Sequence, residues 1–563
     1  MRKLNFILTF VIAVGLLATS CSKKMEPLDS SLFTANPSPL ELVGSKVPVT
    51  VNGRYPAKWF DKKAEVVVTP VLKYQGTETL GSPHSYQGEK VSGNAITIYQ
   101  AEGGAFTVNS NFDYVPAMKK SELFLRFSVS RKGNHLIDFD VKVADGIVST
   151  AALADAKTVT PALAPDAFQR IIKEAHDADI MFLIQRAELR SSELNSGDVK
   201  AWKELVQEVY NDDRKNLNVE VSAYASPDGG YSLNDKLAAQ REKNTSNYLK
   251  KELKKSKVDT DVNAKYTAQD WEGFQKLVQA SNLQDKELVL RVLSMYNDPA
   301  RREREIKNIS SVYSELAETI LPRLRRSRLI ANVEIIGKTD EELVAATNSS
   351  AINELSVEEL LYAATLNGVS KEKVYSLVTQ KYANDYRGWN NLGDVYFAKG
   401  DYSKASQAYA KASSISSRAA EPKMNQALLA MIDGDNAKAE QLLGSASGAN
   451  TLNEALGVLY IKKGDYTKAV QAFGDTKSNN AALAQILSKN YNKAQQTLNG
   501  ITAKDATTNY LSAIVAARTN NTSGVASSLK SAIDKGASKT EILNDLEFAR
   551  FLSNPDVKNM LGL

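Results

Sequence analysis

The chain has 563 residues, enough for about three to four domains, and its 43% hydrophobic and 24% charged residues exclude wholesale disorder. The 70 basic and 65 acidic residues leave a formal net charge of +5, which is too small an excess to indicate nucleic acid as a partner. The only cysteine, Cys21, leaves no possibility of an intrachain disulfide or a cysteine-based zinc site.

The amino terminus has the pattern of an export signal. Arg2 and Lys3 make the first residues basic, and the apolar run over 6–17 is shorter than the ~20 residues that span a bilayer as a helix. Small residues then lead to Cys21, and this ending resembles the lipobox of bacterial lipoproteins. The resemblance implies that residues 1–20 are a signal peptide and that acyl chains on Cys21 anchor the protein in the outer membrane.

Residues 21–38 are predicted to be a lipidated tether, because they are polar and contain proline. In the Bacteroidota, lipoproteins that are exported to the cell surface carry an acidic run directly after the cysteine. Lys23 and Lys24 occupy that position here. The contrast implies that the protein faces the periplasm, and the cell surface is the alternative.

Residues 39–150 alternate apolar and polar side chains with a period of two, which is typical of half-buried antiparallel strands. Glycine and proline clusters separate the alternating runs. The spacing predicts an N-terminal β-sandwich. His84 and His135 are isolated in the sequence, so we expect no metal site or other site chemistry in this domain.

A change of composition marks the next boundary. Residues 151–178 begin with a stretch rich in alanine and proline, which predicts a linker. A central domain over 179–338 then alternates strands and helices, and this order predicts an α+β fold. The expected elements are a strand over 180–189, a helix capped by Asp198, a strand over 217–224, a turn over 223–231, a helix through 234–249 and a closing strand over 329–336.

Two motifs in this domain are specific. The helix after the turn carries Asn234, Leu237 and Arg241 at the spacing Asn-x-x-Leu-x-x-x-Arg, and the closing strand over 327–335 contains Asn-Val-Glu-Ile. Both resemble motifs of the OmpA-like peptidoglycan-binding domain. The resemblance implies that the domain binds the diaminopimelate of a peptidoglycan stem peptide and that Arg241 holds its carboxylate.

In that family, the turn before this helix carries an aspartate for the ammonium group of the diaminopimelate. The matching position is Ser226 in this chain, and a serine cannot neutralise an ammonium group. Asp228 lies two residues further on and is the candidate for this role, while Ser226 and Asn234 complete the predicted site. The alternative is that Asp228 only shapes the turn and Arg241 pairs with a nearby acid.

A helical insertion is predicted over 262–324. It contains Asp-Trp-Glu at 270–272 and an arginine cluster at 301–304, and Leu-Pro-Arg-Leu-Arg-Arg follows at 321–326. A similar insertion marks OmpA-like domains of Bacteroidota envelope proteins, and the pattern predicts two or three helices. The arginine cluster faces either an anionic polymer or lipid headgroup, or solvent with neighbouring glutamates as partners.

Residues 339–563 contain a repeated helical pattern. Trp389, Leu392 and Tyr409 occupy fixed offsets, and a second copy runs over 456–473. The pattern resembles the tetratricopeptide repeat (TPR). The resemblance implies an all-α solenoid whose stacked helix pairs form a concave groove, and it implies an unknown protein partner in that groove.

No enzyme motif stands out, because the sequence lacks a Gly-x-Ser-x-Gly elbow, a phosphate-binding loop and a His-Glu-x-x-His helix. We therefore expect no catalytic residue, no cofactor and no metal. The combined features predict a non-enzymatic envelope lipoprotein that tethers the outer membrane to peptidoglycan and docks protein partners through its TPR groove. The alternative is an adaptor subunit of an outer-membrane assembly, secretion or fimbrial complex whose OmpA-like domain no longer binds peptidoglycan.

Overall fold

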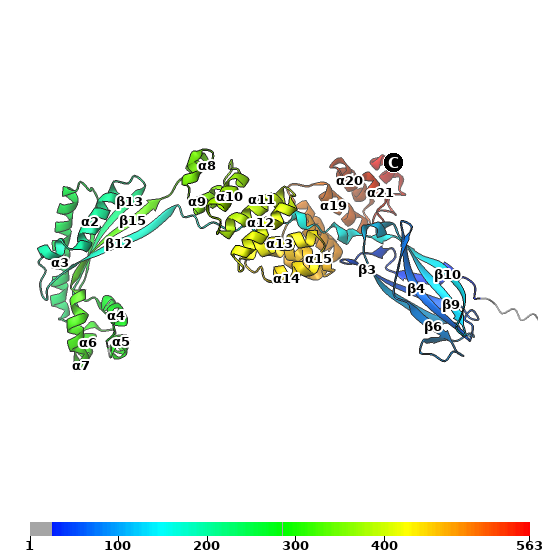
Figure 1. Ribbon diagram of the computed structural model, residues 1–563, viewed down its shortest axis with the longest axis horizontal. Coiled ribbons are helices and arrows are strands. Elements are labelled where there is room, and N and C mark those ends of the chain that lie inside the picture. Colours follow the sequence, from blue (N-terminus) through cyan, green and yellow to red (C-terminus); the bar gives the residue numbers. More distant parts are fainter. Residues whose placement is uncertain (1–24, 284, 563) are drawn as a thin grey trace, which may run out of the picture. The chain divides into compact units, whose positions relative to one another are not determined.

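The computed structural model describes residues 25–283 and 285–562, and the chain forms two compact units (Figure 1). The first unit joins the N-terminal part, through Pro165, to the C-terminal part from Tyr375 onward, and the second unit is Asp166–Val374. The second unit is therefore inserted into the sequence of the first. No helix within the described residues is both long and apolar enough to cross a bilayer. The predicted signal peptide over 1–20 and the predicted acylation site Cys21 lie outside them.

The N-terminal part of the first unit consists of β-sheets around a common apolar core. Val47, Val49 and Val51 are buried, whereas the residues between them are partly exposed, so the alternation in the sequence sets which face of the strand meets the core. One sheet has the order β1 (Phe33–Asn36), β3 (Lys46–Tyr55) and β8 (Gly104–Asp113). The larger sheet has the order β10 (Asn134–Asp145), β9 (Glu122–Arg131), β4 (Ala64–Tyr74), β6 (His84–Gly88) and β7 (Ile96–Ile98), with β5 (Thr77–Leu80) paired to β4.

This domain begins earlier than the sequence indicates. Strand β1 lies inside the segment over 21–38 that is predicted as a tether, and it pairs with β3. Phe33 and Ala35 of β1 are buried, and so are Met25 and Leu28 before it. Four alternating residues are a weak signal in a sequence, but they form a strand where a neighbouring strand offers unpaired backbone groups.

The C-terminal part of the first unit is an array of helix pairs. Gly393 shows why the repeat pattern has this form: a Cβ there would lie 2.5 Å from the ring of Tyr409, so only glycine allows the two helices to approach this closely. Gly457 stands at the same distance from the ring of Phe473. The pairs are α11 (Tyr386–Ala398) with α12 (Tyr402–Ile415), α13 (Ala420–Ile432) with α14 (Asn436–Gly444), α15 (Leu452–Lys463) with α16 (Tyr466–Phe473), α17 (Asn479–Leu487) with α18 (Tyr491–Asn499), and α19 (Ala506–Arg518) with α20 (Thr522–Asp534); the short α21 (Lys539–Leu543) and α22 (Pro555–Leu561) follow.

The segment predicted as a linker over 151–178 is ordered along its length. Its first half contains the turns η3 (Thr150–Leu153) and η4 (Ala156–Thr158) and then runs to Pro165 against the array, shown in cyan in Figure 1. Ala162 and Ala164 in this half are buried. From Ile171 the chain enters a strand of the second unit. Alanine-rich composition suggests a linker, but small side chains also let a backbone lie close against a helix surface.

The second unit contains a mixed sheet in the order β12 (Ile171–Met181), β15 (Arg326–Ile336), β13 (Lys215–Tyr224) and β14 (Val262–Thr267). Strands β13 and β14 are parallel, and the other neighbours are antiparallel. Helices α2 (Gly197–Tyr210) and α3 (Tyr231–Lys255) pack against one face of this sheet. Trp202 of α2 and Leu249 of α3 share a core with Val219 and Leu329 of the strands.

Some elements of this unit differ from the expected ones. Strand β12 ends at Met181, so most of the predicted strand over 180–189 is a loop. The side chain of Ser196 caps α2, and Asp198 lies in its first turn. The predicted insertion over 262–324 begins with strand β14, because this stretch finds a parallel partner in β13. The insertion continues with α4 (Trp271–Gln279), α5 (Lys286–Met295), α6 (Pro299–Asn308) and α7 (Ser310–Thr319).

The region over 339–563 that is predicted as repeats does not start with the array. Helices α8 (Asp340–Thr347) and α9 (Val357–Ala363) belong to the second unit, and α10 (Lys371–Lys381) crosses the boundary between the units. Thr339 and Ser356 cap α8 and α9 through reciprocal hydrogen bonds with a glutamate three residues on. The caps satisfy backbone groups of the first turn, and Leu343 of α8 and Leu360 of α9 are buried.

Candidate functional site

The predicted site residues meet in one pocket of the second unit, which we call the arginine pocket. Arg241, Asp228, Ser226 and Asn234 all line it. Sequence reasoning did not single out Arg325, a further lining residue, whose only signal was its place in the arginine-rich run over 321–326. The other lining residues are Ile184, Gln185, Ala225, Gly229, Leu233 and Leu237.

Arg241 on α3 is buried and holds the backbone around it. Its guanidinium donates to the carbonyl oxygens of Arg186, at 2.9 Å, and Tyr224, at 2.8 Å. A third hydrogen bond reaches the carbonyl of Leu183 at 3.3 Å, and the guanidinium lies over the ring of Phe182 at 4.9 Å. These contacts fix the loop after β12 to the end of β13, so Arg241 builds one wall of the pocket.

The charge of Arg241 is not balanced by a carboxylate. Within the described residues, no acidic side chain forms an ion pair with it. Burial lowers the pKa of Arg241 to about 10, the positive charge of Arg325 acts in the same direction, and Asp228 opposes both. The shift indicates a cation that has lost water without gaining a full counter-charge. An anion bound in the pocket would supply that counter-charge.

Asp228 already has a cationic partner. Its carboxylate accepts a hydrogen bond from Arg325 Nη2 at 2.9 Å and another from the Ser226 hydroxyl at 2.6 Å. Arg325 Nε also donates to that hydroxyl at 3.3 Å. The residue expected to hold an ammonium group is thus engaged, and the alternative pairing of Arg241 with a nearby acid is not formed. Two guanidinium groups and one carboxylate line the pocket, so positive charge is in excess.

Asn234 shapes the turn that carries Ser226 and Asp228. Its amide donates to the carbonyl oxygens of Ser226, at 2.9 Å, and Gly229, at 2.8 Å. Gln269 donates to the same Gly229 oxygen at 2.9 Å. Because these bonds go to the backbone, Asn234 positions the turn and thereby the carboxylate of Asp228.

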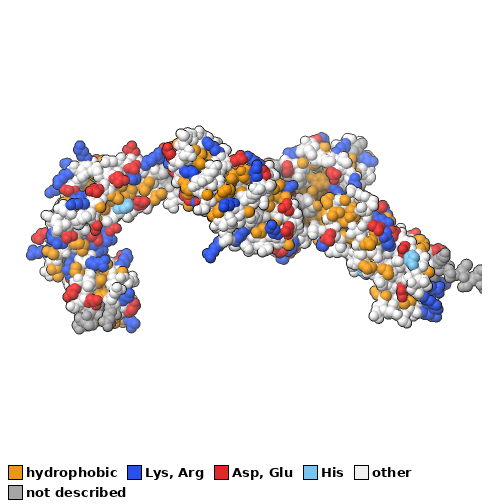
Figure 2. Space-filling model, in the orientation of Figure 1, with side chains coloured by type: hydrophobic (Ala, Val, Ile, Leu, Met, Phe, Trp, Pro, Cys, Tyr) orange, Lys and Arg blue, Asp and Glu red, His pale blue; other side chains and the backbone are white. Residues whose placement is uncertain are grey.

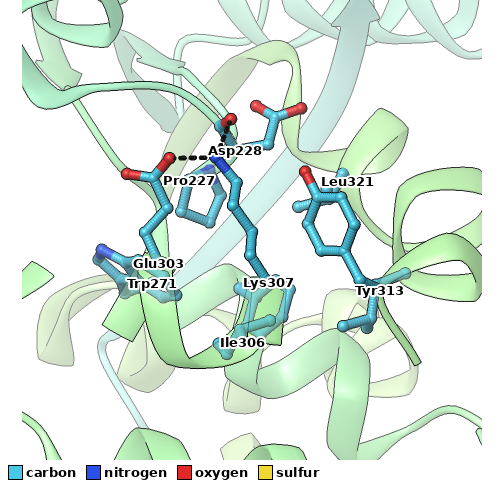
Figure 3. Close-up of a pocket in the computed structure, with 10 residues that line it drawn as sticks. Pro227, Asp228, Trp271, Glu303, Ile306, Lys307, Tyr313 and Leu321 are labelled. Atoms are coloured by element: carbon cyan, nitrogen blue, oxygen red, sulfur yellow. Dashed lines mark hydrogen bonds and ion pairs between the residues drawn. The ribbon is translucent and has the colours of Figure 1, made fainter. Parts of the chain in front are cut away.

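The helical insertion supports the other side of this turn, as Figure 3 shows. Lys307 on α6 donates to the backbone oxygen of Asp228 at 3.2 Å and pairs with Glu303 at 2.5 Å. A mostly apolar pocket lies beside these groups; its lining residues include Pro227, Trp271, Phe274, Ile306, Tyr313, Leu316 and Leu321. The position of Asp228 therefore depends on the insertion as well as on α3.

The arginine cluster over 301–304 is largely engaged within the insertion. Arg301 lies over the ring of Tyr296 at 4.3 Å. Arg302 donates to the backbone oxygens of Tyr296 and, at 2.9 Å, Leu293. On the face shown in Figure 2, basic and acidic side chains are interspersed. These contacts favour a structural role for the cluster over a surface for an anionic polymer.

Comparison with known proteins identifies the repeat. The tetratricopeptide repeat family matches residues 386–418, and a comparison with curated proteins finds no match. Among solved structures, the chain is similar to PilF of Pseudomonas aeruginosa, with 16% identity, a TM-score of 0.27, and coverage of 38% of this chain and 99% of that one. It is also similar to a tetratricopeptide repeat protein from Parabacteroides merdae, with 13% identity, a TM-score of 0.26, and coverage of 50% and 100%. Similarities with TM-scores this low do not support an inference about function.

The chain thus has a β-rich N-terminal region with several sheets and a TPR region in its C-terminal part. TPR repeats imply protein partners, and the comparisons identify none of them.

Proposed function

We propose that the chain is a non-enzymatic lipoprotein of the cell envelope that binds peptidoglycan through the arginine pocket and protein partners through its repeat array. In this proposal, acyl chains on Cys21 anchor the protein in the outer membrane and the rest faces the periplasm. The observation that carries wall binding is the state of Arg241, a buried arginine that lines a pocket and lacks an ion-pair partner among the described residues.

The charge and the rim of the pocket suit a stem peptide. A carboxylate beside Arg241 and Arg325 would offset the excess positive charge, and the planar guanidinium group binds carboxylates through paired hydrogen bonds. Leu233 and Ile184 line the pocket although they are 46% and 59% exposed, so its rim is apolar. A peptide that ends in diaminopimelate and alanine offers both a carboxylate and short aliphatic groups.

The test adds a charge at the rim and leaves the internal contacts intact. Leu233→Asp places a negative charge beside the pocket, and Leu233→Asn is the neutral control of nearly the same size. Leu233 lies in the first turn of α3, where an aspartate is favourable for the helix. We expect Leu233→Asp to weaken co-sedimentation with diaminopimelate-type peptidoglycan at least about tenfold, and Leu233→Asn to weaken it much less.

One observation favours the adaptor alternative. Asp228 is paired with Arg325, so no free carboxylate in the pocket awaits the ammonium group of diaminopimelate. If the wild-type protein does not co-sediment with peptidoglycan, or if both Leu233 variants bind like the wild type, wall binding through this pocket is wrong. The second unit would then be a protein-interaction module of an outer-membrane complex.

A further inference from the structure

Asparagine recurs at one position of the repeat array. The residues are Asn391 in α11, Asn425 in α13 and Asn480 in α17, and each is at most 4% exposed. Each lies nine residues before the residue of left-handed conformation that follows its helix; those residues are Gly400, Gly434 and Lys489. Buried amide groups that repeat in this way require polar partners that repeat with them.

Their partner is the main chain of the segment over 155–164. Asn391 accepts from the N–H of Ala164 at 2.9 Å and donates to its carbonyl at 3.0 Å. Asn425 brackets Ala162 in the same way, at 2.6 and 3.0 Å. The side-chain oxygen and nitrogen of each of these two asparagines therefore both bond to the backbone of one residue of the segment.

A third asparagine continues this pattern along the array. Asn480 accepts from the N–H of Asp155 at 3.0 Å and donates to its carbonyl at 2.9 Å. It also donates to the hydroxyl of Thr158 at 2.9 Å. At Ala162, Asn390 is a second donor to the carbonyl that Asn425 also contacts, at 2.9 Å. The contacts follow the backbone of the segment across α17, α13 and α11.

The buried side chains of the segment are apolar, so they contribute burial and no hydrogen bonds of their own. Ala156, Val159, Ala162 and Ala164 are all at most 2% exposed. The hydrogen bonds go to main-chain groups of Asp155, before the turn η4, and of Ala162 and Ala164 after it. The buried side chains of the segment are small, so its backbone lies close to the helices. The array thus recognises the shape of a peptide and excludes large residues at these positions.

We propose that the array surface formed by α11, α13 and α17, which we call the asparagine face, is a binding site for a peptide segment with small side chains. Its resident ligand is this chain's own segment over 155–164.

Hydrogen bonds, burial and chain connectivity all favour the segment remaining bound to the asparagine face. Removing the segment would break the hydrogen bonds that Asn391, Asn425 and Asn480 make to its backbone. It would also expose apolar surface that Ala156, Val159 and Ala162 now cover. The segment is continuous with β11 (Ile147–Val148) before it and with the second unit after it. This connection keeps its effective concentration in the millimolar range, so a free peptide does not compete well. A protein partner of the array therefore either displaces the segment or docks on another surface of the array.

The experiment uses a fluorescent peptide with the sequence of residues 151–166 as the probe. We compare the full chain with a variant in which residues 155–164 are replaced by glycine and serine in equal number. At ~10 µM peptide, the wild type is expected to show no binding, because the tethered segment competes at millimolar effective concentration, and the replaced chain is expected to bind. Asn391→Leu with Asn425→Leu in the replaced chain should weaken binding at least about tenfold. Binding by the wild type equal to that of the replaced chain overturns the proposal, as does no binding by a replaced chain that is folded.

Hydrogen exchange tests the same idea without replacing the segment. In the wild-type full chain, the amides of Ala162 and Ala164 should exchange much more slowly than exposed loop amides. Asn391→Leu should speed exchange at Ala164, whereas Asn499→Ala, an exposed asparagine of α18, should leave it unchanged. Exchange at Ala162 and Ala164 as fast as in exposed loops of the wild type would contradict the proposal.

Discussion

The side-chain amide of Asn425 accepts from the N–H of Ala162 and donates to its carbonyl, although 263 positions of sequence separate the two residues. The N-terminal part of the chain thereby completes the core of the C-terminal array, and the two parts form one unit. The chain leaves this unit at Pro165, whose carbonyl accepts from Arg387 of α11 at 3.4 Å, and it returns to the unit at Tyr375.

Asn425→Ala should destabilise the first unit. The change removes both bonds to Ala162 and leaves its buried N–H without a partner, which costs about 2–4 kcal/mol in the free energy of unfolding. Urea unfolding followed by circular dichroism measures the loss. Asn499→Ala on the exposed side of α18 is the control and should change stability by less than about 0.5 kcal/mol. Equal stability of the two variants would show that the asparagine contacts do not hold the unit together.

Gly457→Ala should destabilise the array by about 1–3 kcal/mol, because the new methyl group would lie 2.5 Å from the ring of Phe473 and force the helices apart. Gly444→Ala has nothing within 4 Å of the new Cβ and serves as the control. We expect the control to be neutral or slightly stabilising, because alanine favours the helix. Thermal unfolding of both variants measures the difference, and a neutral Gly457→Ala would show that the helix pair has room that the structure does not indicate.

Asp140 should make the N-terminal sheets sensitive to acid. Hydrogen bonds from Arg126, at 2.9 and 3.0 Å, and from Lys73, at 2.6 Å, lower the pKa of its carboxyl group despite its partial burial. A carboxyl whose pKa is lower in the folded state stabilises the fold above its unfolded pKa and loses that effect as the pH falls, here between about pH 5 and pH 2. Asp140→Asn should therefore show a smaller loss of stability than the wild type over that range.

The measurement is the urea midpoint of both proteins at several pH values. Asp259→Asn, at an exposed position of the second unit, removes an equal charge and should leave the pH dependence unchanged. Parallel curves for wild type and Asp140→Asn would contradict the expected role of Asp140.

Asp228→Asn should strengthen the binding of a simple carboxylate in the arginine pocket. The change removes the partner of Arg325 and leaves two guanidinium groups without a compensating negative charge. Calorimetric titration with acetylated D-alanine, which has a carboxylate and no ammonium group, measures the affinity. Weaker binding by Asp228→Asn would mean that Asp228 positions the pocket more than it offsets its charge.

Local patterns predicted the elements that depend on neighbouring residues. The alternation of Val47, Val49 and Val51 predicted a strand, because successive side chains of a strand face the core and solvent in turn. The offsets of Trp389, Leu392 and Tyr409 predicted a repeated helix pair, and the structure shows why Gly393 lies between them: the ring of Tyr409 leaves no room for a Cβ there. The prediction of a strand over 180–189 was wrong, because most of this apolar run forms a loop whose backbone is hydrogen-bonded to Arg241.

The resemblance to the OmpA-like domain implied one site for Ser226, Asp228, Asn234 and Arg241, and all four line the arginine pocket. It did not include Arg325, which meets Asp228 across 97 positions of sequence. No short motif specifies such a contact; it depends on how the insertion returns the chain to the sheet.

The sequence by itself determined the alternating strands of the N-terminal domain from β3 onward and the helix pairs of the repeats, because the patterns of burial and of small and large side chains that specify them lie within short stretches of the chain. Only the tertiary structure decided that residues 155–164 occupy the array. That contact is made through backbone groups, which every residue has, so it leaves almost no trace in the side chains of the segment. The sequence signal of this contact lies instead in the array, as three asparagines at one repeated position. Their role as partners of the segment is shown only by the tertiary structure.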